Sequence, residues 1–191
     1  RLTLTPTRLF DCIDWQLAEF PQEDMFAAKE DGVWRKYSTK KVKDLVDKLS
    51  MGLMHVGIGY QDGTVEGRDK VAVLSNNRPE WLILDMAVQQ CGAILTPIYP
   101  TISVNELEFV LNDASVKLVF VSDQDLYDKV QSIRSKTPAV QAVYTFNDIQ
   151  PALHWKDLLR MGTKEEEDSL KKIKAKIDSK ELATIIYTSG T

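Results

Sequence analysis

The chain has 191 residues, with 24 Lys or Arg against 28 Asp or Glu, so its formal net charge is −4. This balance and a hydrophobic fraction of 43% argue against intrinsic disorder, and the mild acidity argues against a nucleic-acid binder, which needs a basic patch. The length predicts one domain, or one and a half, with a core that needs no covalent staples.

The two cysteines, Cys12 and Cys91, lie far apart and outside any metal-binding spacing. This argues against a zinc site and a disulfide framework and favours a reducing, cytoplasmic compartment. No apolar run of about 18 residues occurs, so we expect no membrane-spanning helix. The first residues, Arg1 to Pro6, include neither an initiator Met nor the apolar region of a signal peptide, so we expect one end to be trimmed.

Helices and strands are predicted to alternate along most of the chain. Capping residues, glycines, prolines and the spacing of apolar residues set their bounds. The predicted elements of the first half are a helix from Thr5-Pro6 to Pro21, a strand at 33–37, a helix capped by Ser38 or Thr39 and ended by Gly57, a loop at 57–69, a strand at 70–75, a deeply buried helix at 79–91 and a strand at 93–98.

The second half continues the pattern, with two S/T-x-x-E capping boxes at helix starts. Its predicted elements are a helix capped by Ser103 with Glu106, a strand at 116–121, a helix around Leu126 to Ile133, a strand at 140–146, a short helix at 153–161, a helix capped by Thr163 with Glu166 and a strand at 182–187. Such alternation predicts an α/β fold: a mostly parallel sheet with helices on both faces. Pro97 and Pro100 limit the pairing of the strand at 93–98 and place its end at an edge or a loop.

Ligands of parallel sheets bind beyond the carboxyl ends of the strands, so the loops there are the candidate sites. In the turn before the helix at 79–91, Asn77 or Arg78 could contact a ligand. An Asn that caps the helix explains the residues of this turn adequately. No arrangement of Ser or Asp residues supports His55 or His154 as a base, so we interpret both as surface or packing residues. Asp123 suits a helix cap better than a metal or phosphoacceptor site. Gly57-Ile58-Gly59 follows a helix and lacks the third glycine of a dinucleotide fingerprint.

The last four residues, Thr188, Ser189, Gly190 and Thr191, follow the strand predicted at 182–187. Small hydroxyl side chains beside a glycine suit a phosphate cradle, because backbone N–H groups and hydroxyls donate to anionic oxygens. Taken alone, the four residues fit an ordinary Ser/Thr turn better.

The rest of the sequence favours a phosphate-binding loop over an ordinary turn, because several segments resemble one family in their order and spacing. The tail resembles the opening of the phosphate loop of adenylate-forming (AMP-binding) enzymes, which include acyl-CoA synthetases, firefly luciferase and the adenylation domains of peptide synthetases. Tyr37-Ser38 resembles the N-terminal subdomain of the family in general, and the other upstream segments resemble the long-chain fatty acyl-CoA synthetases. The matching segments are Ile185–Thr191, Tyr37-Ser38, Asp69–Trp81, Gly92–Thr101 and Asn112-Asp113.

The resemblance implies that residues 1–191 are the N-terminal portion of an AMP-binding domain, cut inside the phosphate loop at 187–191. It implies that Thr188, Ser189, Gly190 and Thr191 bind the ATP phosphates and that Tyr187 positions this loop. The remaining functional residues of the family would lie beyond residue 191, so no catalytic residue is expected within the chain, and the loop at 57–69 is longer than the resemblance leads us to expect.

For the whole enzyme the resemblance implies a long-chain fatty-acid–CoA ligase that uses ATP, Mg²⁺ and CoA. Its partners would be small molecules, with no nucleic acid, and both a peripheral membrane contact and a homodimer stay open. Two alternatives also stay open. One is an adenylate-forming enzyme for an aryl, short-chain or amino acid, and the other is a non-enzymatic flavodoxin-like signalling or binding module.

Overall fold

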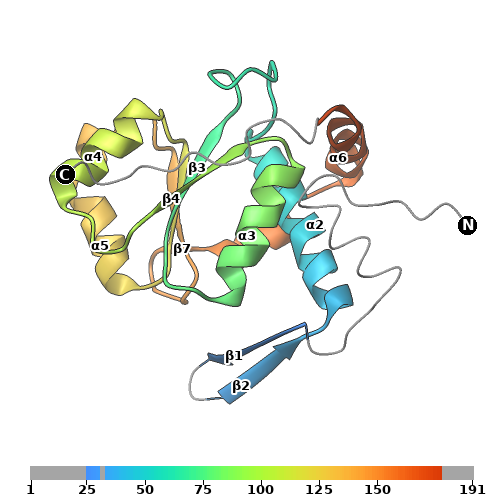
Figure 1. Cartoon of the computed structure of the whole chain (residues 1–191), viewed down its shortest axis with the longest axis horizontal. Coiled ribbons are helices and arrows are strands. Elements are labelled where there is room, and N and C mark those ends of the chain that lie inside the picture. The colour runs from blue at the N-terminus through green and yellow to red at the C-terminus, as the bar shows by residue number, and fades with distance from the viewer. Residues whose placement is uncertain (1–24, 31–32, 178–191) are drawn as a thin grey trace, which may run out of the picture.

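The computed structural model describes residues 25–30 and 33–177, which form a layered α/β structure with a two-stranded ribbon beside it (Figure 1). Two pairs of helices enclose a five-stranded sheet. On one face lie α2 (Thr39–His55) and α3 (Pro79–Gln90), and on the other lie α4 (Val104–Asp113) and α5 (Gln124–Ser132). The predicted fold class is therefore confirmed, whereas the helix predicted from Thr5 and the strand predicted at 182–187 lie outside the described residues.

The sheet is parallel throughout and contains a reversal of strand order. Its strands, in spatial order, are β4 (Ile94–Ile98), β3 (Lys70–Leu74), β5 (Leu118–Val121), β6 (Ala142–Thr145) and β7 (Leu153–His154). The chain goes outward from β3 to β4 and then crosses to β5 on the other side of β3. In such sheets, ligands bind outside the carboxyl ends of the strands at the point of reversal. The edge beyond β3 and β5 is therefore where a site is expected.

The central strand β3 is buried on both faces. Val71 and Val73 pack with α2 and α3, whereas Ala72 and Leu74 pack with α4 and α5. Successive side chains of a strand point to opposite faces, so a sheet covered on both sides needs a continuous apolar run. The sequence of β3 meets this requirement, which is why its position could be predicted.

Most helix ends form where the sequence predicts them. The Ser38 hydroxyl accepts a hydrogen bond from the backbone N–H of Lys41 at 3.1 Å, and Gly57, with φ of +90°, follows the end of α2. Ser103 caps α4 by accepting from the N–H of Glu106 at 3.2 Å. Each side-chain cap satisfies a backbone donor that the first helical turn leaves without an intrahelical partner.

Two short strands were not predicted. β1 (Phe26–Glu30) pairs antiparallel with β2 (Val33–Tyr37), and β7 replaces the start of the short helix expected at 153–161. The rest of that segment is the 3₁₀ helix η2 (Trp155–Arg160). Pairing with β6 and the edge-on packing of Trp155 against Phe146, with centroids 6.1 Å apart, fix this conformation. Both are tertiary contacts that override local preference.

The capping box predicted at Thr163 and Glu166 is wrong, although α6 (Lys164–Lys176) does begin there. Thr163 accepts no hydrogen bond from the helix backbone, and its hydroxyl instead donates to the carboxylate of Glu166. The reason is a tertiary contact: Glu166 also meets Nδ1 of His55, at the end of α2. These hydrogen bonds, that from Thr163 first, lower the pKa of Glu166 to about 2 from an ordinary value of 4.5.

This contact makes a prediction about acid stability. The pKa of Glu166 is lower in the folded than in the unfolded state. Its ionised carboxylate therefore stabilises the folded chain above about pH 4.5, and this stabilisation is lost as the pH falls towards 2. We expect Glu166→Gln to lower the urea midpoint at pH 5 and to have a much smaller effect at pH 3. Glu165→Gln, one residue earlier on the exposed side of α6, is the control. An equal loss at both pH values for Glu166→Gln would contradict the prediction.

The loop at 57–69 is built around buried charges. The Asp69 carboxylate accepts from the N–H of Gly59 at 2.9 Å and from Gln61 at 2.8 Å, and it pairs with Lys117 at 2.6 Å. Arg68, also buried, donates to the carbonyl oxygen of Gly92 at 2.7 Å. Because the loop leads into the start of β3, it lies at the amino edge of the sheet, away from the edge where ligands are expected.

Candidate functional site

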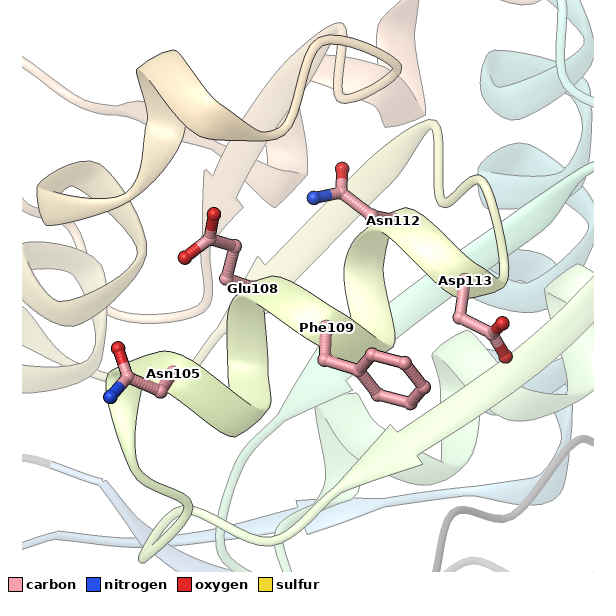
Figure 2. A pocket seen from close by; sticks show the side chains of 5 residues that line it. All are labelled: Asn105, Glu108, Phe109, Asn112 and Asp113. Atoms are coloured by element: carbon pink, nitrogen blue, oxygen red, sulfur yellow. The ribbon is translucent and has the colours of Figure 1, made fainter.

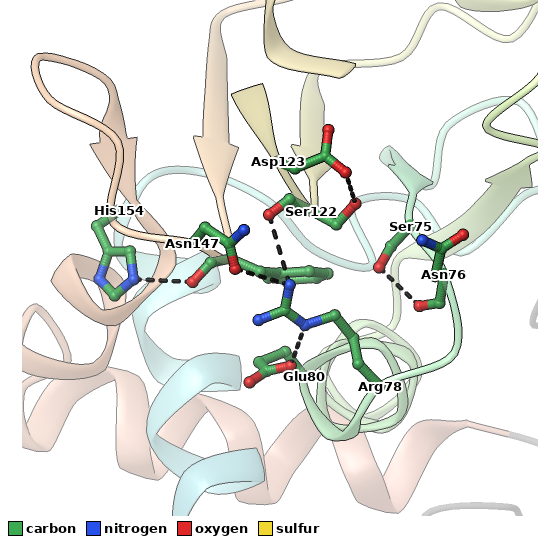
Figure 3. A network of polar contacts seen from close by, with 9 residues as sticks. Ser75, Asn76, Arg78, Glu80, Ser122, Asp123, Asn147 and His154 are labelled. Carbon is green, nitrogen blue, oxygen red and sulfur yellow. Dashed lines mark hydrogen bonds and ion pairs between the residues drawn. The ribbon is translucent and has the colours of Figure 1, made fainter. Parts of the chain in front are cut away.

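The loops at the carboxyl edge of the sheet meet around one side chain, Arg78 (Figure 3). Its Nη1 donates to Oδ1 of Asn147 at 2.9 Å, beyond β6, and lies 3.5 Å from the carbonyl oxygen of Ser122, beyond β5. Its Nε donates to the carboxylate of Glu80 at 2.5 Å, and the guanidinium lies 5.6 Å from the ring centroid of Phe146. Arg78 therefore connects the loops that follow β3, β5 and β6.

The backbone conformation of Arg78 explains why its side chain can reach the neighbouring loops instead of capping α3. Arg78, and not an asparagine, is the N-cap of α3, with φ of −157° and ψ of 161° and no side-chain cap. The residue before a proline is restricted to extended conformations, and Pro79 at the first helical position needs no N–H partner. The expectation of an Asn cap is therefore wrong. Glu80 places its charge in the first turn of α3, where the helix dipole favours an acid.

The Arg78–Glu80 pair predicts a specific pattern of stabilities. Glu80 is 5% exposed, so Arg78→Ala leaves a buried carboxylate without its cation and is expected to cost about 1–3 kcal/mol. Adding Glu80→Gln to Arg78→Ala removes that charge and should restore part of the loss. Urea unfolding of the two single variants and the double variant measures the coupling. Strictly additive losses would show that the pair carries no coupling energy.

Asp123 serves as a helix cap, as predicted. Its Oδ1 accepts from the N–H of Leu126 at 3.1 Å, and its Oδ2 accepts from the hydroxyl of Ser122 at 3.2 Å. With both oxygens engaged in structural hydrogen bonds, Asp123 is poorly suited to accept a phosphoryl group. Within residues 25–30 and 33–177, no cluster of three His, Cys, Asp or Glu side chains could hold a metal ion.

The histidines and the described cysteine have structural surroundings. Nε2 of His154 lies 3.0 Å from the carbonyl oxygen of Phe146, and His55 contacts Glu166, which agrees with the interpretation of both as surface or packing residues. Cys91 is fully buried and outside any disulfide, and burial raises the pKa of its thiol to about 12. A thiol with so high a pKa is not a nucleophile at neutral pH.

A shallow hollow also lies on the outer face of α4 (Figure 2). Figure 2 shows its lining side chains along one side of the helix: Asn105, Glu108, Phe109, Asn112 and Asp113. Two acids and no cation line it, so it would repel the phosphates of a nucleotide. It therefore does not compete with the carboxyl edge as a nucleotide site.

The residues predicted to bind ATP, Tyr187 and the four from Thr188 to Thr191, lie outside the described residues, so their role stays a prediction. The described structure places Arg78, Ser122 and Asn147 together at the carboxyl edge. Of these the sequence singled out only Arg78, as a ligand contact, and its role as a link between loops was missed. The available signal was an Arg directly before Pro-Glu at the end of a buried strand.

Comparisons with known proteins agree with this architecture. A family model described as AMP-binding enzyme matches residues 13–191. The chain is 30% identical over 162 residues to the long-chain-fatty-acid–CoA ligase FadD15 of Mycobacterium bovis, an alignment that covers 84% of this chain and 26% of that protein. It is 26% identical over 201 residues to long chain acyl-CoA synthetase 4 of Arabidopsis thaliana, covering 95% of this chain and 28% of that protein.

A solved structure shows the same fold. The long-chain-fatty-acid-CoA ligase FadD1 from Archaeoglobus fulgidus superposes with a TM-score of 0.70 at 20% identity, over 98% of this chain and 36% of that one. The chain thus spans about a quarter of the length of the curated relatives it matches. Its five-stranded parallel sheet with helices on both faces matches the N-terminal domains of adenylate-forming enzymes. The chain belongs to the AMP-binding enzyme family of adenylate-forming ligases.

Proposed function

We propose that the chain is the N-terminal portion of a long-chain fatty-acid–CoA ligase. The observation that carries the proposal is the family match, which runs through to residue 191 and includes the Tyr187–Thr191 segment. The names of the relatives at 26–30% identity support a long-chain fatty acid as the substrate. In the proposed reaction, the fatty-acid carboxylate attacks the α-phosphorus of ATP and pyrophosphate leaves. The CoA thiol then displaces AMP from the acyl-adenylate.

In this proposal, Thr188, Ser189, Gly190 and Thr191 hold the β- and γ-phosphates of ATP, and Tyr187 positions their loop. Negative charge on the phosphate oxygens is stabilised by donors that are fixed before the reaction. In this proposal the strand predicted at 182–187 joins the parallel sheet, so that the loop after it lies at the carboxyl edge, where Arg78 connects the other loops. The described part of the chain thus serves as the scaffold of the phosphate loop.

The proposal assigns no step to Mg²⁺. The described residues include no group of three potential metal ligands. The resemblance to the family implies that the acidic residue that binds the metal lies beyond residue 191. It implies the same position for the residues that bind adenosine. We therefore expect the 191-residue chain by itself to be inactive, and ATP, CoA and the fatty acid to be substrates of the full-length protein.

A substrate panel tests the proposal. Exchange of labelled pyrophosphate into ATP by the full-length protein reports adenylate formation with palmitate, acetate, benzoate and an amino acid in turn. We expect the highest exchange with palmitate, followed by release of AMP when CoA is added. A preference for one of the other acids would contradict the proposed long-chain substrate but would agree with adenylate formation. Absence of exchange with every acid would contradict the proposed activity.

A further inference from the structure

The guanidinium group of Arg78 is held on several sides but keeps one nitrogen free (Figure 3). Its Nε contacts Glu80, and its Nη1 contacts Asn147 and the carbonyl oxygen of Ser122. The group also lies over the ring of Phe146. Nη2 has no hydrogen-bond partner among the described residues, and Figure 3 shows no contact from it. Two of the five N–H donors of this arginine are therefore left for a ligand.

The free nitrogen is accessible from solvent. The side chain of Arg78 is 23% exposed. Among the described residues, the buried polar side-chain atoms that lack a hydrogen bond are Oε1 of Gln90 and Oγ1 of Thr96, and Nη2 of Arg78 is not one of them. A ligand in solution can therefore reach Nη2.

The contacts of Arg78 prepare its guanidinium to bind an anion. The planar N–H groups of an arginine match the oxygens of a phosphate or a carboxylate, and such charge-assisted hydrogen bonds are stronger than neutral ones. A mobile arginine loses side-chain entropy when it binds a ligand. The contacts with Glu80 and Asn147 already fix this side chain, so most of that loss occurs when the chain folds.

The start of α3 favours a phosphate group in particular. Arg78 is the N-cap of α3 and gives it no side-chain cap, so the helix N-terminus and the guanidinium belong to the same residue. A helix N-terminus attracts anions through its unpaired N–H groups and its dipole. The charges of the nearby acids are already engaged, since Glu80 pairs with Arg78 and both oxygens of Asp123 accept hydrogen bonds. A phosphate group has enough oxygens to accept from Nη2 and from the helix start together.

We propose that Arg78 and the start of α3 form a phosphate-binding site at the carboxyl edge of the sheet. The site lies at the reversal of strand order, where ligands of parallel sheets bind. It is additional to the segment Tyr187–Thr191, and binding of a phosphate group there does not depend on the ligase activity. In the proposed ligase, ATP and CoA are the two substrates that carry such a group.

An NMR titration tests the proposal on the 191-residue chain, whose described part contains no helix that is long and apolar enough to cross a membrane. Pyrophosphate is the probe. We expect it to shift the side-chain resonances of Arg78 and Asn147 and the backbone amide resonance of Glu80. Ser189→Ala combined with Thr191→Ala should leave these shifts unchanged, which separates the site from the proposed phosphate loop. Titrations with ATP and with CoA then distinguish the two sources of the phosphate group.

Matched variants provide a second readout, the affinity for pyrophosphate measured by calorimetry. Arg78→Gln combined with Glu80→Gln removes the site without leaving an unpaired buried charge, and we expect it to weaken binding at least about tenfold. Glu80→Gln alone keeps Arg78 and removes a negative charge beside the anion, so it should bind at least as tightly as the unchanged chain. The control is Arg160→Gln, at the exposed end of η2, which should bind as the unchanged chain does.

The proposal is overturned if pyrophosphate leaves the resonances of Arg78 unshifted, or if the double variant at Arg78 and Glu80 binds as tightly as the unchanged chain. Loss of the shifts in the chain with Ser189→Ala and Thr191→Ala would also overturn it, because the phosphate group would then belong to the proposed phosphate loop. Pyrophosphate exchange by the full-length protein is a separate measurement, so the failure of one proposal is distinguished from the failure of the other.

Discussion

Replacing Gly52 with alanine is expected to destabilise the chain by about 1–3 kcal/mol, which is the usual cost of overpacking. In most helices the same substitution would stabilise by about 1 kcal/mol. Gly52 lies inside α2, where the backbone of η2 packs against it. A Cβ at this position would lie 2.0 Å from the carbonyl oxygen of Leu158 and 2.7 Å from its carbonyl carbon. Since these are backbone atoms, α2 and η2 would have to move apart.

Gly57→Ala is the matched control for this prediction. Gly57 has φ of +90°, but no neighbouring atom lies within 4 Å of the place that a Cβ would occupy, so its substitution measures backbone strain without a clash. We expect a larger loss of unfolding free energy for Gly52→Ala than for Gly57→Ala, measured by urea unfolding. A Gly52→Ala chain as stable as the unchanged one would show that α2 and η2 do not approach so closely.

The second large effect is expected in the proposed phosphate loop. Removing one fixed donor to a developing negative charge typically lowers kcat about 100-fold, so Ser189→Ala combined with Thr191→Ala should lower the kcat of the full-length protein by at least about that factor. The loss should fall mainly on kcat and less on the KM for the fatty acid, because the proposal assigns these hydroxyls to ATP and not to the acid. Initial rates of palmitate-dependent pyrophosphate release measure both constants.

Two outcomes separate a role in phosphate binding from a role in folding. The double variant should unfold at the same urea concentration as the unchanged protein, and Ser179→Ala, outside the proposed loop, should keep full activity. Unchanged kcat in the double variant would contradict the assignment of these hydroxyls to the phosphates.

The parts of the fold that were predictable are those with a local physical signature. Buried strands such as β3 are continuous apolar runs, and the capping hydroxyl of Ser103 marks the start of α4 by a local hydrogen bond. β7 has two residues and depends on its pairing with β6, so its sequence carries no comparable pattern. The prediction of a capping box at Thr163 was wrong because Glu166 forms a hydrogen bond with His55, which lies 111 residues earlier in the chain.

The same distinction applies to the candidate site. The carboxyl edge could be predicted from the order of the elements, because parallel strands place their following loops together. The role of Arg78 as a link between loops could not be predicted, because its partners Ser122 and Asn147 lie 44 and 69 residues away in the sequence. The residues proposed to bind the ATP phosphates come from a resemblance of the sequence to a family, and they lie outside the described residues.

The most direct test of the central claim is the detection of palmitoyl-AMP by mass spectrometry after incubation with ATP, Mg²⁺ and palmitate. The claim is that this chain supplies the scaffold and the first half of the phosphate loop of a fatty-acid–CoA ligase. It predicts that the full-length protein forms palmitoyl-AMP and that the purified 191-residue chain does not. Palmitoyl-AMP formed by the 191-residue chain alone, or its absence with the full-length protein, would contradict the claim.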